Sequence, residues 1–225
     1  MEHESRLVLS ESQEDYLKQI LLLGGDGHRV STQDLAHRLE VKPASVTEMV
    51  GRLAHFKLVE YAPYRGVRLT DAGRKVALEM LRHHRLLETF LVEALGYTWD
   101  QVHDEAERLE HVISERFEAR IAEVMGHPTH DPHGDPIPAP DLSLPEAGSS
   151  VPLRDLPIGA SGALVRVSAQ DPDNLDLLNR LGLSPGCEVE VIADDPRGVR
   201  VRVDEDCILL PAYLARMLWI ERADQ

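Results

Sequence analysis

Apolar residues recur at helical spacing in three segments of the first 56 residues, and capping or helix-breaking residues bound each segment. The first segment carries a Ser-x-x-Asp pattern at residues 12–15 and stops before a run of glycines, which predicts a helix that ends near Leu23. The second helix is expected to begin at Ser31 or Thr32. The third is expected to begin at Pro43, because proline is favoured in the first helical turn.

A hairpin is predicted after these helices. Two β-like runs, residues 58–61 and 67–70, flank the turn sequence APYRG. Two short helices followed by a hairpin are typical of a winged helix-turn-helix domain, in which the second of the two helices enters the major groove of DNA. The residues then expected to contact DNA are Lys42, Pro43, Ala44, Ser45, Thr47, Glu48 and Arg65.

These residues suit different parts of a duplex. Lys42 and Arg65 are expected to bind phosphates, which gives affinity and salt dependence without reading sequence. The small side chain of Ala44 allows close approach to base edges, including thymine methyl groups. Glu48 either accepts a hydrogen bond from a cytosine amino group or is a solvated helical residue. The alternative to DNA binding is a helical trio that makes only protein contacts.

Two longer helices are predicted after residue 70. Thr70 is expected to cap a helix that runs through Leu95, and Thr98 or Asp100 is expected to cap another that continues to Met125. Each is followed by a glycine, the residue that most often ends a helix.

The rest of the chain has the pattern of a linker followed by strands. Between Gly126 and Ser150 the chain carries six prolines, which predict an extended segment. Its His-x-x-His-x-x-His run could bind metal, but a flexible loop offers little preorganisation, so ordinary loop histidines are the favoured interpretation: His127, His130 and His133. A small β-barrel with one short helix near 175–181 is predicted from alternating runs at 163–167, 189–192, 199–203 and 207–210. The predicted fold class is mainly α with a C-terminal β-barrel.

The charge of the chain is unevenly distributed. Its net charge is −15, yet residues 1–75 carry 11 basic and 11 acidic residues, so the whole excess lies beyond residue 75. Such a chain repels DNA by default, which suits a protein that must be activated before it binds. No apolar run approaches the roughly 20 residues that cross a bilayer, and no signal-peptide pattern is present, so we expect a cytoplasmic protein without a membrane contact. Cys187 and Cys207 form no C-x-x-C pair, and both are expected to be small core residues.

Histidines and carboxylates share one face of each longer helix. His103, Glu107, Glu110 and His111 lie within an arc of about 100° if the second of these helices is continuous. His84 and Glu88 repeat the i, i+4 spacing on the helix before it. Oxygen and imidazole donors without thiolates suit Mn²⁺ or Fe²⁺. A solvated polar face is the alternative for either helix alone. No catalytic motif is recognisable, so an enzyme is not expected.

The chain resembles the diphtheria-toxin-repressor family of iron- and manganese-dependent transcriptional regulators over essentially its whole length. The segments that carry the resemblance are SQEDYLKQI at 12–20, PASVTEMVGRL at 43–53, YRGVRLT at 64–70, HRLLETFL at 84–91, VHDEAERLEHVIS at 102–114, PHGDPIP at 132–138 and LGLSPG at 181–186. The resemblance implies a winged helix-turn-helix domain at 1–75, a helical metal-binding and dimerisation domain at 76–141, a linker at 142–150 and an SH3-like domain of the ferrous-transport-accessory type at 151–225.

The resemblance also implies two metal sites. The primary-site positions are Asp15, Glu107, Glu110 and His111, and Asp15 and Glu107 replace a methionine and a cysteine of iron-responsive members, which favours Mn²⁺ over Fe²⁺. Lys18 stands where manganese transport regulators carry a further carboxylate, which argues against their binuclear cluster. The ancillary-site positions are His84, Glu88 and His103, with Asp171 and Asp173 as candidates from the SH3-like domain.

The function implied is that of a homodimeric repressor that binds palindromic, double-stranded operator DNA once Mn²⁺, or alternatively Fe²⁺, is bound. Two other classes of protein remain open at this point. One is a metal-buffering protein or a metal-dependent hydrolase, although neither needs a wing. The other is a winged-helix regulator that senses an organic molecule and leaves the carboxylates solvated.

Overall fold

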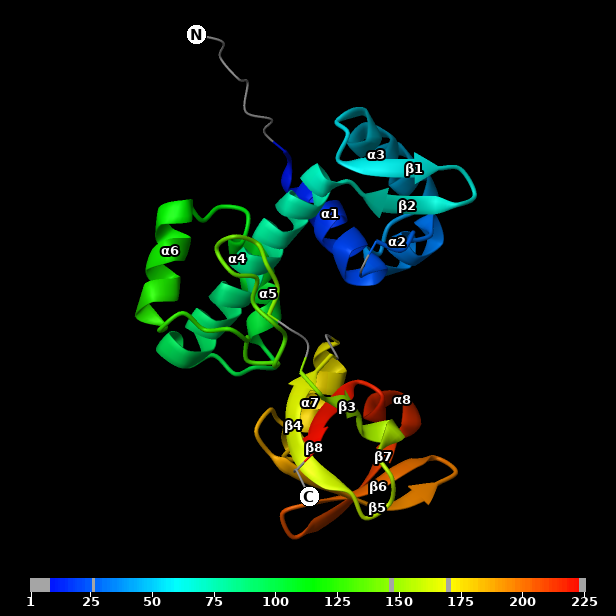
Figure 1. The fold of residues 1–225 in the computed structure, drawn as a ribbon, viewed down its shortest axis with the longest axis vertical. Coiled ribbons are helices and arrows are strands. Elements are labelled where there is room, and N and C mark those ends of the chain that lie inside the picture. The colour runs from blue at the N-terminus through cyan, green and yellow to red at the C-terminus, as the bar shows by residue number, and fades with distance from the viewer. Residues whose placement is uncertain (1–8, 26, 146–147, 169–170, 223–225) are drawn as a thin grey trace. The chain divides into compact units, whose positions relative to one another are not determined.

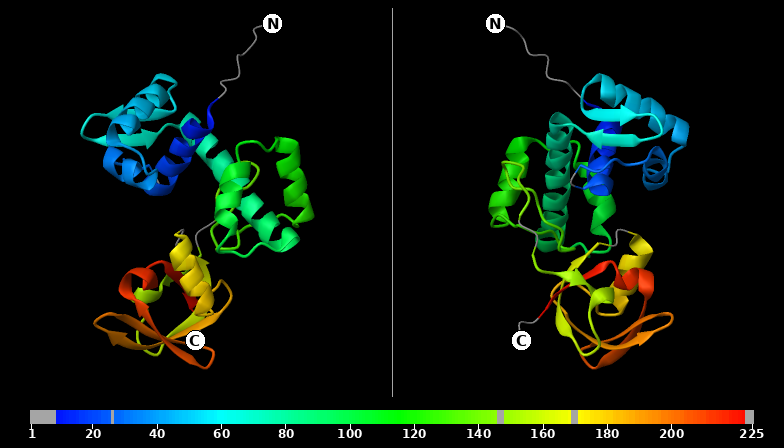
Figure 2. Two further views of the ribbon diagram at one scale, coloured as in Figure 1. Left: turned by 180° about the vertical axis from the view of Figure 1, so that it is seen from behind. Right: turned by 45° about the vertical axis from the view of Figure 1, so that its right-hand side comes forward.

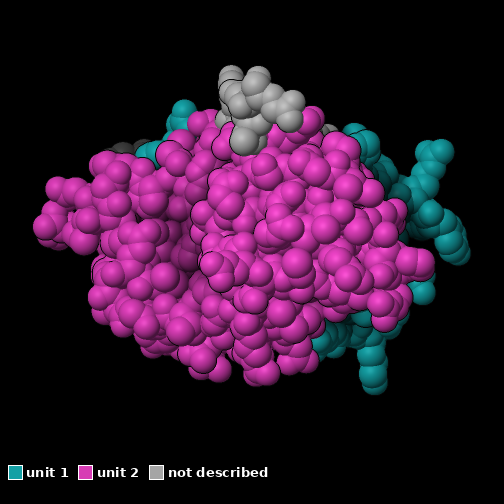
Figure 3. Space-filling view, turned by 90° about the horizontal axis from the view of Figure 1, so that it is seen from below, with its two compact units in different colours: residues 1–83, 140–142 teal, residues 84–139, 143–225 magenta. Residues whose placement is uncertain are grey.

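The computed structural model describes residues 9–25, 27–145, 148–168 and 171–222. The chain forms two compact units, one from residues 1–83 with 140–142 and the other from residues 84–139 with 143–225 (Figures 1 and 3). Helix α4 (Asp71–Leu95) contributes residues to both units.

The first unit is a winged helix. Helices α1 (Glu11–Gly24), α2 (Thr32–Arg38) and α3 (Pro43–His55) precede the hairpin of β1 (Val59–Ala62) and β2 (Gly66–Leu69). Their apolar faces form one core, which includes fully buried residues from every helix: Leu17, Leu35, Val46, Val50 and Leu53. The predicted winged helix-turn-helix is therefore present with the predicted order of elements.

The cap of α1 differs from the prediction. The capping box is formed by Ser10 and Gln13, and the backbone N–H of Ser10 donates to Gln13 Oε1 at 2.9 Å. The Ser-x-x-Asp pattern at 12–15 lies within the helix instead, so the first turn begins earlier than predicted. Ser31 and Thr70 do act as caps, because their hydroxyls accept from the N–H groups of Asp34 and Gly73.

In the second unit, the predicted helix from residue 98 or 100 to Met125 is wrong, because the chain forms two helices, α5 (Val102–Leu109) and α6 (Glu115–Val124). Ser114 ends the continuity, since its extended backbone starts α6 and its hydroxyl accepts from the N–H of Phe117. Glu110 and His111 consequently lie in the turn after α5 rather than on a long helix. Buried residues of α4, α5 and α6 form the core of this part, among them Leu86, Leu87, Val102, Ala106 and Ile121.

The C-terminal part contains a six-stranded sheet in which all pairings are antiparallel, in the order β3-β8-β4-β5-β6-β7. The strands are β3 (Val151–Pro152), β4 (Ser161–Val167), β5 (Glu188–Asp195), β6 (Gly198–Val203), β7 (Asp206–Pro211) and β8 (Leu218–Arg222). Short helices η1 (Leu153–Asp155), α7 (Pro172–Arg180) and α8 (Ala212–Ala215) complete it (Figure 2). Among the described residues β3 and β7 do not pair, so closure of the predicted barrel is not confirmed.

The two cysteines do not behave alike. Cys187 packs against the core of the C-terminal part, whereas Cys207 is exposed, so the prediction that both are core residues is wrong for Cys207. Within the described ranges, none of the helices is both long and apolar enough for a membrane span.

Candidate metal centre

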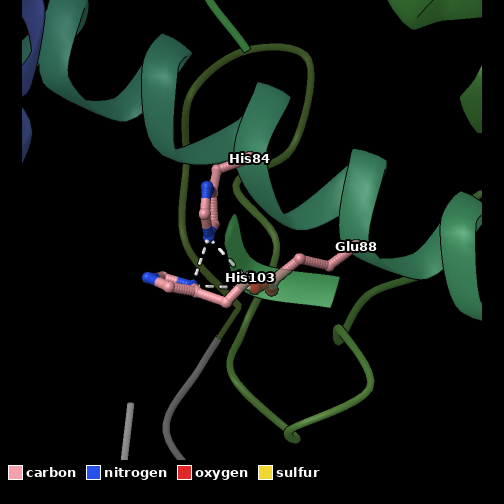
Figure 4. A group of neighbouring side chains, drawn as sticks. All are labelled: His84, Glu88 and His103. Atoms are coloured by element: carbon pink, nitrogen blue, oxygen red, sulfur yellow. Dashed lines mark hydrogen bonds and ion pairs between the residues drawn. The ribbon is translucent and has the colours of Figure 1, made fainter. Parts of the chain in front are cut away.

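Three predicted ligands converge in the second unit. His84 and Glu88 lie one turn apart on α4, and His103 reaches them from the first turn of α5 (Figure 4). His84 Nε2 lies 3.0 Å from Glu88 Oε1 and 3.1 Å from His103 Nδ1, and His103 Nδ1 lies 3.1 Å from Glu88 Oε1. His84 and Glu88 are buried. The predicted ancillary residues of the helical domain are therefore neighbours.

The spacing of these atoms fits a small divalent cation. Ligand atoms about 2.1 Å from an octahedrally coordinated ion lie about 3.0 Å from one another. The three separations in the His84–Glu88–His103 group, 3.0, 3.1 and 3.1 Å, are close to that value. Two imidazoles and a carboxylate also form a donor set that suits Mn²⁺ or Fe²⁺.

A hydrogen bond orients His84 within this group. Its Nδ1 lies 2.5 Å from Oε2 of Glu110, which is buried in the turn after α5. If Nδ1 carries the proton that this carboxylate accepts, Nε2 keeps a lone pair directed at Glu88 and His103, as in metal-binding histidines. His84, Glu107 and Glu110 form a second group whose ligand atoms lie within 4.8 Å of one another. His84 is thus shared by two groups of possible ligands.

A loop adds two buried residues that the sequence interpretation did not assign to the site. Asp131 and His133 lie beside Glu88, with His133 Nδ1 3.5 Å from Glu88 Oε2, and the three form another group with ligand atoms within 4.8 Å. The prediction of an ordinary loop histidine is therefore wrong for His133. The signal that marked it was its place in PHGDPIP, where prolines and a glycine restrict the loop.

The loop is held against α4 by a buried arginine. The Arg85 guanidinium lies 3.5 Å from Asp131 Oδ2 and 3.7 Å from Asp135 Oδ1, and it donates to the carbonyl of Pro136. Asp131 Oδ1 in turn accepts from the backbone N–H groups of His133 and Asp135 at 2.8 and 2.9 Å. Because Arg85 follows His84 on α4, one turn of this helix carries both a possible metal ligand and the anchor of the loop.

Burial and pairing shift the pKa values of this group strongly. Burial, reinforced by the nearby charges of Glu88 and Asp135, raises the pKa of Asp131 to about 7. Burial would lower the pKa of His133, but its hydrogen bond to Glu88 and the surrounding carboxylates raise it to about 9. Burial opposes ionisation of Glu88, yet the neighbouring His84, His103 and His133 hold its pKa well below the usual range. Such a concentration of mutually perturbed buried groups is typical of a functional site.

The other predicted ligands come from three parts of the chain: α1, the segment of α5 with the turn after it, and the start of α7. Asp15 is half-buried on α1 of the first unit, whereas Glu107, Glu110 and His111 belong to the second unit, where His111 Nε2 lies 3.6 Å from Glu110 Oε1. Asp171 is exposed and caps α7, because its Oδ1 accepts from the N–H groups of Asp173 and Asn174. No group of possible ligands among the described residues includes Asp171 or Asp173.

The residues predicted to contact DNA are all exposed. Six of them line the start of α3 and the residue before it, and Arg65 lies in the β1–β2 turn: Lys42, Pro43, Ala44, Ser45, Thr47, Glu48 and Arg65. Glu48 forms an ion pair with Arg52 one turn further along α3. A solvent-exposed helix beside a wing is the arrangement of winged-helix DNA-binding domains.

Comparison with known proteins assigns each part of the chain. Residues 8–67 match the iron dependent repressor N-terminal DNA binding domain, residues 70–139 match the iron dependent repressor metal binding and dimerisation domain, and residues 151–222 match the FeoA domain. The iron-dependent repressor IdeR of Mycobacterium leprae is 34% identical over 95% of this chain and 98% of its own length. The chain belongs to the iron-dependent repressor family.

Other members of this family are similar over the same length. The diphtheria toxin repressor of Corynebacterium efficiens is 32% identical over 96% of this chain and 97% of its own length. A manganese-dependent transcriptional repressor solved in complex with manganese is 39% identical, with a TM-score of 0.86 over 94% of this chain and 100% of that one. The likeness therefore extends to both iron- and manganese-dependent repressors.

Proposed function

We propose that this protein is a metal-dependent transcriptional repressor that binds palindromic operator DNA as a homodimer when Mn²⁺, or alternatively Fe²⁺, is bound. It would control genes of metal homeostasis. The observation that carries this proposal is the group of buried His84 and Glu88 with half-buried His103, whose spacing fits a divalent cation, in a chain that also has an exposed helix of the DNA-reading type. Neither a metal-buffering protein nor a hydrolase needs that helix and wing.

We assign four functional segments to the chain in this proposal. Residues 1–75 bind DNA, and residues 76–141 bind metal and dimerise. Residues 142–150 form a linker to the SH3-like domain, which spans residues 151–225. The resemblance and the family membership support this division.

In the proposed primary site, Asp15 joins Glu107, Glu110 and His111. Three carboxylates near one another repel, and a bound cation would supply the charge that offsets them. Asp15 belongs to α1, which shares one apolar core with α2 and α3, so a change in the position of α1 would be transmitted to those helices through this core. Metal and DNA must then strengthen each other's binding to the same extent.

In the proposed ancillary site, His84, Glu88 and His103 hold a second ion. The sequence offered Asp171 and Asp173 as further ligands from the SH3-like domain. The positions of Asp131 and His133 beside Glu88 instead favour Asp131 and His133 as the additional ligands. Glu107 and Asp15 favour Mn²⁺ in the primary site, because carboxylates are harder ligands than the sulfur atoms they replace.

The proposal is tested by DNA binding at controlled metal concentration. The probe is a duplex that the Mn²⁺-loaded wild-type protein selects from a random-sequence pool. Binding should require Mn²⁺ or Fe²⁺ and should be reversed by a chelator, and Glu110→Gln and His111→Ala should lose it while their unfolding temperatures remain close to wild type. Glu105→Gln, on α5 and paired with Arg108, is the matched control. DNA binding that ignores metal and chelator would refute the proposal.

A further inference from the structure

Tyr64 lies at the tip of the wing in an unusual conformation. The turn between β1 and β2 is closed by the N–H of Arg65, which donates to the carbonyl of Ala62 at 3.0 Å. Tyr64 has a φ of 64°, in the left-handed region, and its relative exposure of 107% means that no part of the described chain covers it. Both the full exposure of the ring and the positive φ are unfavourable for a tyrosine.

Hydrogen bonds and close packing hold the base of the wing against the rest of the first unit. Val30 and Val67 exchange backbone hydrogen bonds of 2.8 and 2.9 Å. The Arg29 guanidinium donates to the carbonyls of Glu60 and Gly66 at 3.0 and 3.1 Å. A Cβ atom on Gly66 would lie 2.3 Å from the carbonyl oxygen of Val30, so the hairpin is pressed closely onto the rest of the unit.

Turn geometry does not account for a tyrosine at this position. The left-handed conformation is strained for an L-residue with a Cβ, and glycine, asparagine and aspartate adopt it more readily. A fully exposed aromatic ring also forgoes the stabilisation that burial would give it. A smaller residue would fit this turn better. The exposed ring is therefore best explained by a contact with a molecule outside the chain.

The surroundings of Tyr64 favour DNA as that partner. Arg65 and Arg68 are exposed on the same hairpin, and β1 packs against α3, the proposed DNA-reading helix (Figure 1). A hairpin beside a helix in the major groove reaches the neighbouring minor groove. There a phenol ring can pack on deoxyribose while its hydroxyl donates to a phosphate oxygen.

We propose that Tyr64 is a DNA-contacting residue, and that its ring packs against the deoxyriboses that line the minor groove next to the phosphates bound by Arg65. This inference rests on the function proposed above. The contact is uncharged, so it contributes affinity without counterion release, whereas Arg65 contributes the salt-dependent part.

The test uses Tyr64→Gly, Tyr64→Phe and Arg65→Ala in the full-length protein with Mn²⁺ and the selected duplex. Glycine accepts the left-handed turn, so Tyr64→Gly should keep or raise the unfolding temperature while it weakens DNA binding about tenfold. Its slope of log affinity against log salt should equal that of wild type. Tyr64→Phe should retain most of the affinity, and Arg65→Ala should lower the slope by about one.

Hydroxyl-radical footprinting supplies the spatial readout. The minor-groove sugars beside the α3 contact should be protected by wild type and Tyr64→Phe and exposed in Tyr64→Gly. Unchanged affinity and an unchanged footprint for Tyr64→Gly would overturn the inference, and would leave a protein partner as the explanation for the ring. If wild type selects no duplex in either metal, the proposed function itself fails, which is a distinguishable result.

Discussion

His84 Nδ1 lies 2.5 Å from Glu110 Oε2, and this hydrogen bond links the two proposed metal sites. His84 belongs to the proposed ancillary site, whereas Glu110 belongs to the proposed primary site. An ion at either site would withdraw electron density from its own ligand. This would change the shared hydrogen bond, so metal binding at one site would affect the ligand at the other directly.

We therefore predict that His84→Gln weakens Mn²⁺ binding at both sites, whereas Glu88→Gln, whose partners His84, His103 and His133 all lie outside the proposed primary site, weakens only one. The expected loss is tenfold or more per affected site, in the range seen when ligands or their hydrogen-bonded partners are removed. Calorimetric titration of metal-free protein with Mn²⁺ measures both events. Two unaltered binding events in His84→Gln would contradict the link.

Gly134 is predicted to be essential for the position of the loop that carries Asp131 and His133 beside the proposed ancillary site. A Cβ atom there would lie 1.9 Å from the carbonyl oxygen of Val165 in β4, and its φ is +82°. Gly134→Ala should displace the loop from β4, break the 2.8 Å hydrogen bond from Val167 N–H to the His133 carbonyl, and weaken Mn²⁺ binding.

Gly182→Ala is the matched control for this variant. Gly182 also has a positive φ, +71°, but nothing lies within 4 Å of its added Cβ. Both variants carry the left-handed penalty of roughly 1–2 kcal/mol, so the difference in their unfolding temperatures isolates the clash. Equal unfolding temperatures and equal Mn²⁺ affinities would show that the loop adapts without loss.

The choice of metal is predicted to follow the proposed primary ligands. The double variant Asp15→Met with Glu107→Cys replaces two hard carboxylates by softer sulfur ligands, so its preference should move from Mn²⁺ toward Fe²⁺. The measurement is the concentration of each ion that gives half-maximal DNA binding under anaerobic conditions. Asp104→Met, at an exposed position of α5, controls for the added methionine. An unchanged ratio in the double variant would argue against these two ligands.

The proposed phosphate contacts predict a defined salt dependence of DNA binding. Lys42→Ala should reduce the slope of log affinity against log salt by about one, because one counterion fewer is released. Its effect should be similar for every DNA sequence. Arg180→Ala is the control, since Arg180 pairs with Asp176 on α7 in the C-terminal part. A slope equal to that of wild type would show that Lys42 does not contact phosphate.

The amino-acid sequence by itself determined the local elements of this protein. Helical spacing and turn residues placed α1 to α4 and the wing, because these signals act between neighbours in the chain, although the start of α1 is set by Ser10 rather than by Ser12. The i, i+4 spacing of His84 and Glu88 likewise identified a pair of possible ligands on one helical face.

Only the tertiary structure decided which distant groups meet. The periodic stripe through His103 and His111 suggested one long helix, but Ser114 divides it, and Glu110 turns toward His84 from the loop that results. His133 lies 45 residues beyond Glu88 in the chain, so no local pattern could reveal that packing of the Arg85-anchored loop brings them together. Periodicity records which way a side chain faces on its own element; which partner it meets there is fixed by long-range packing.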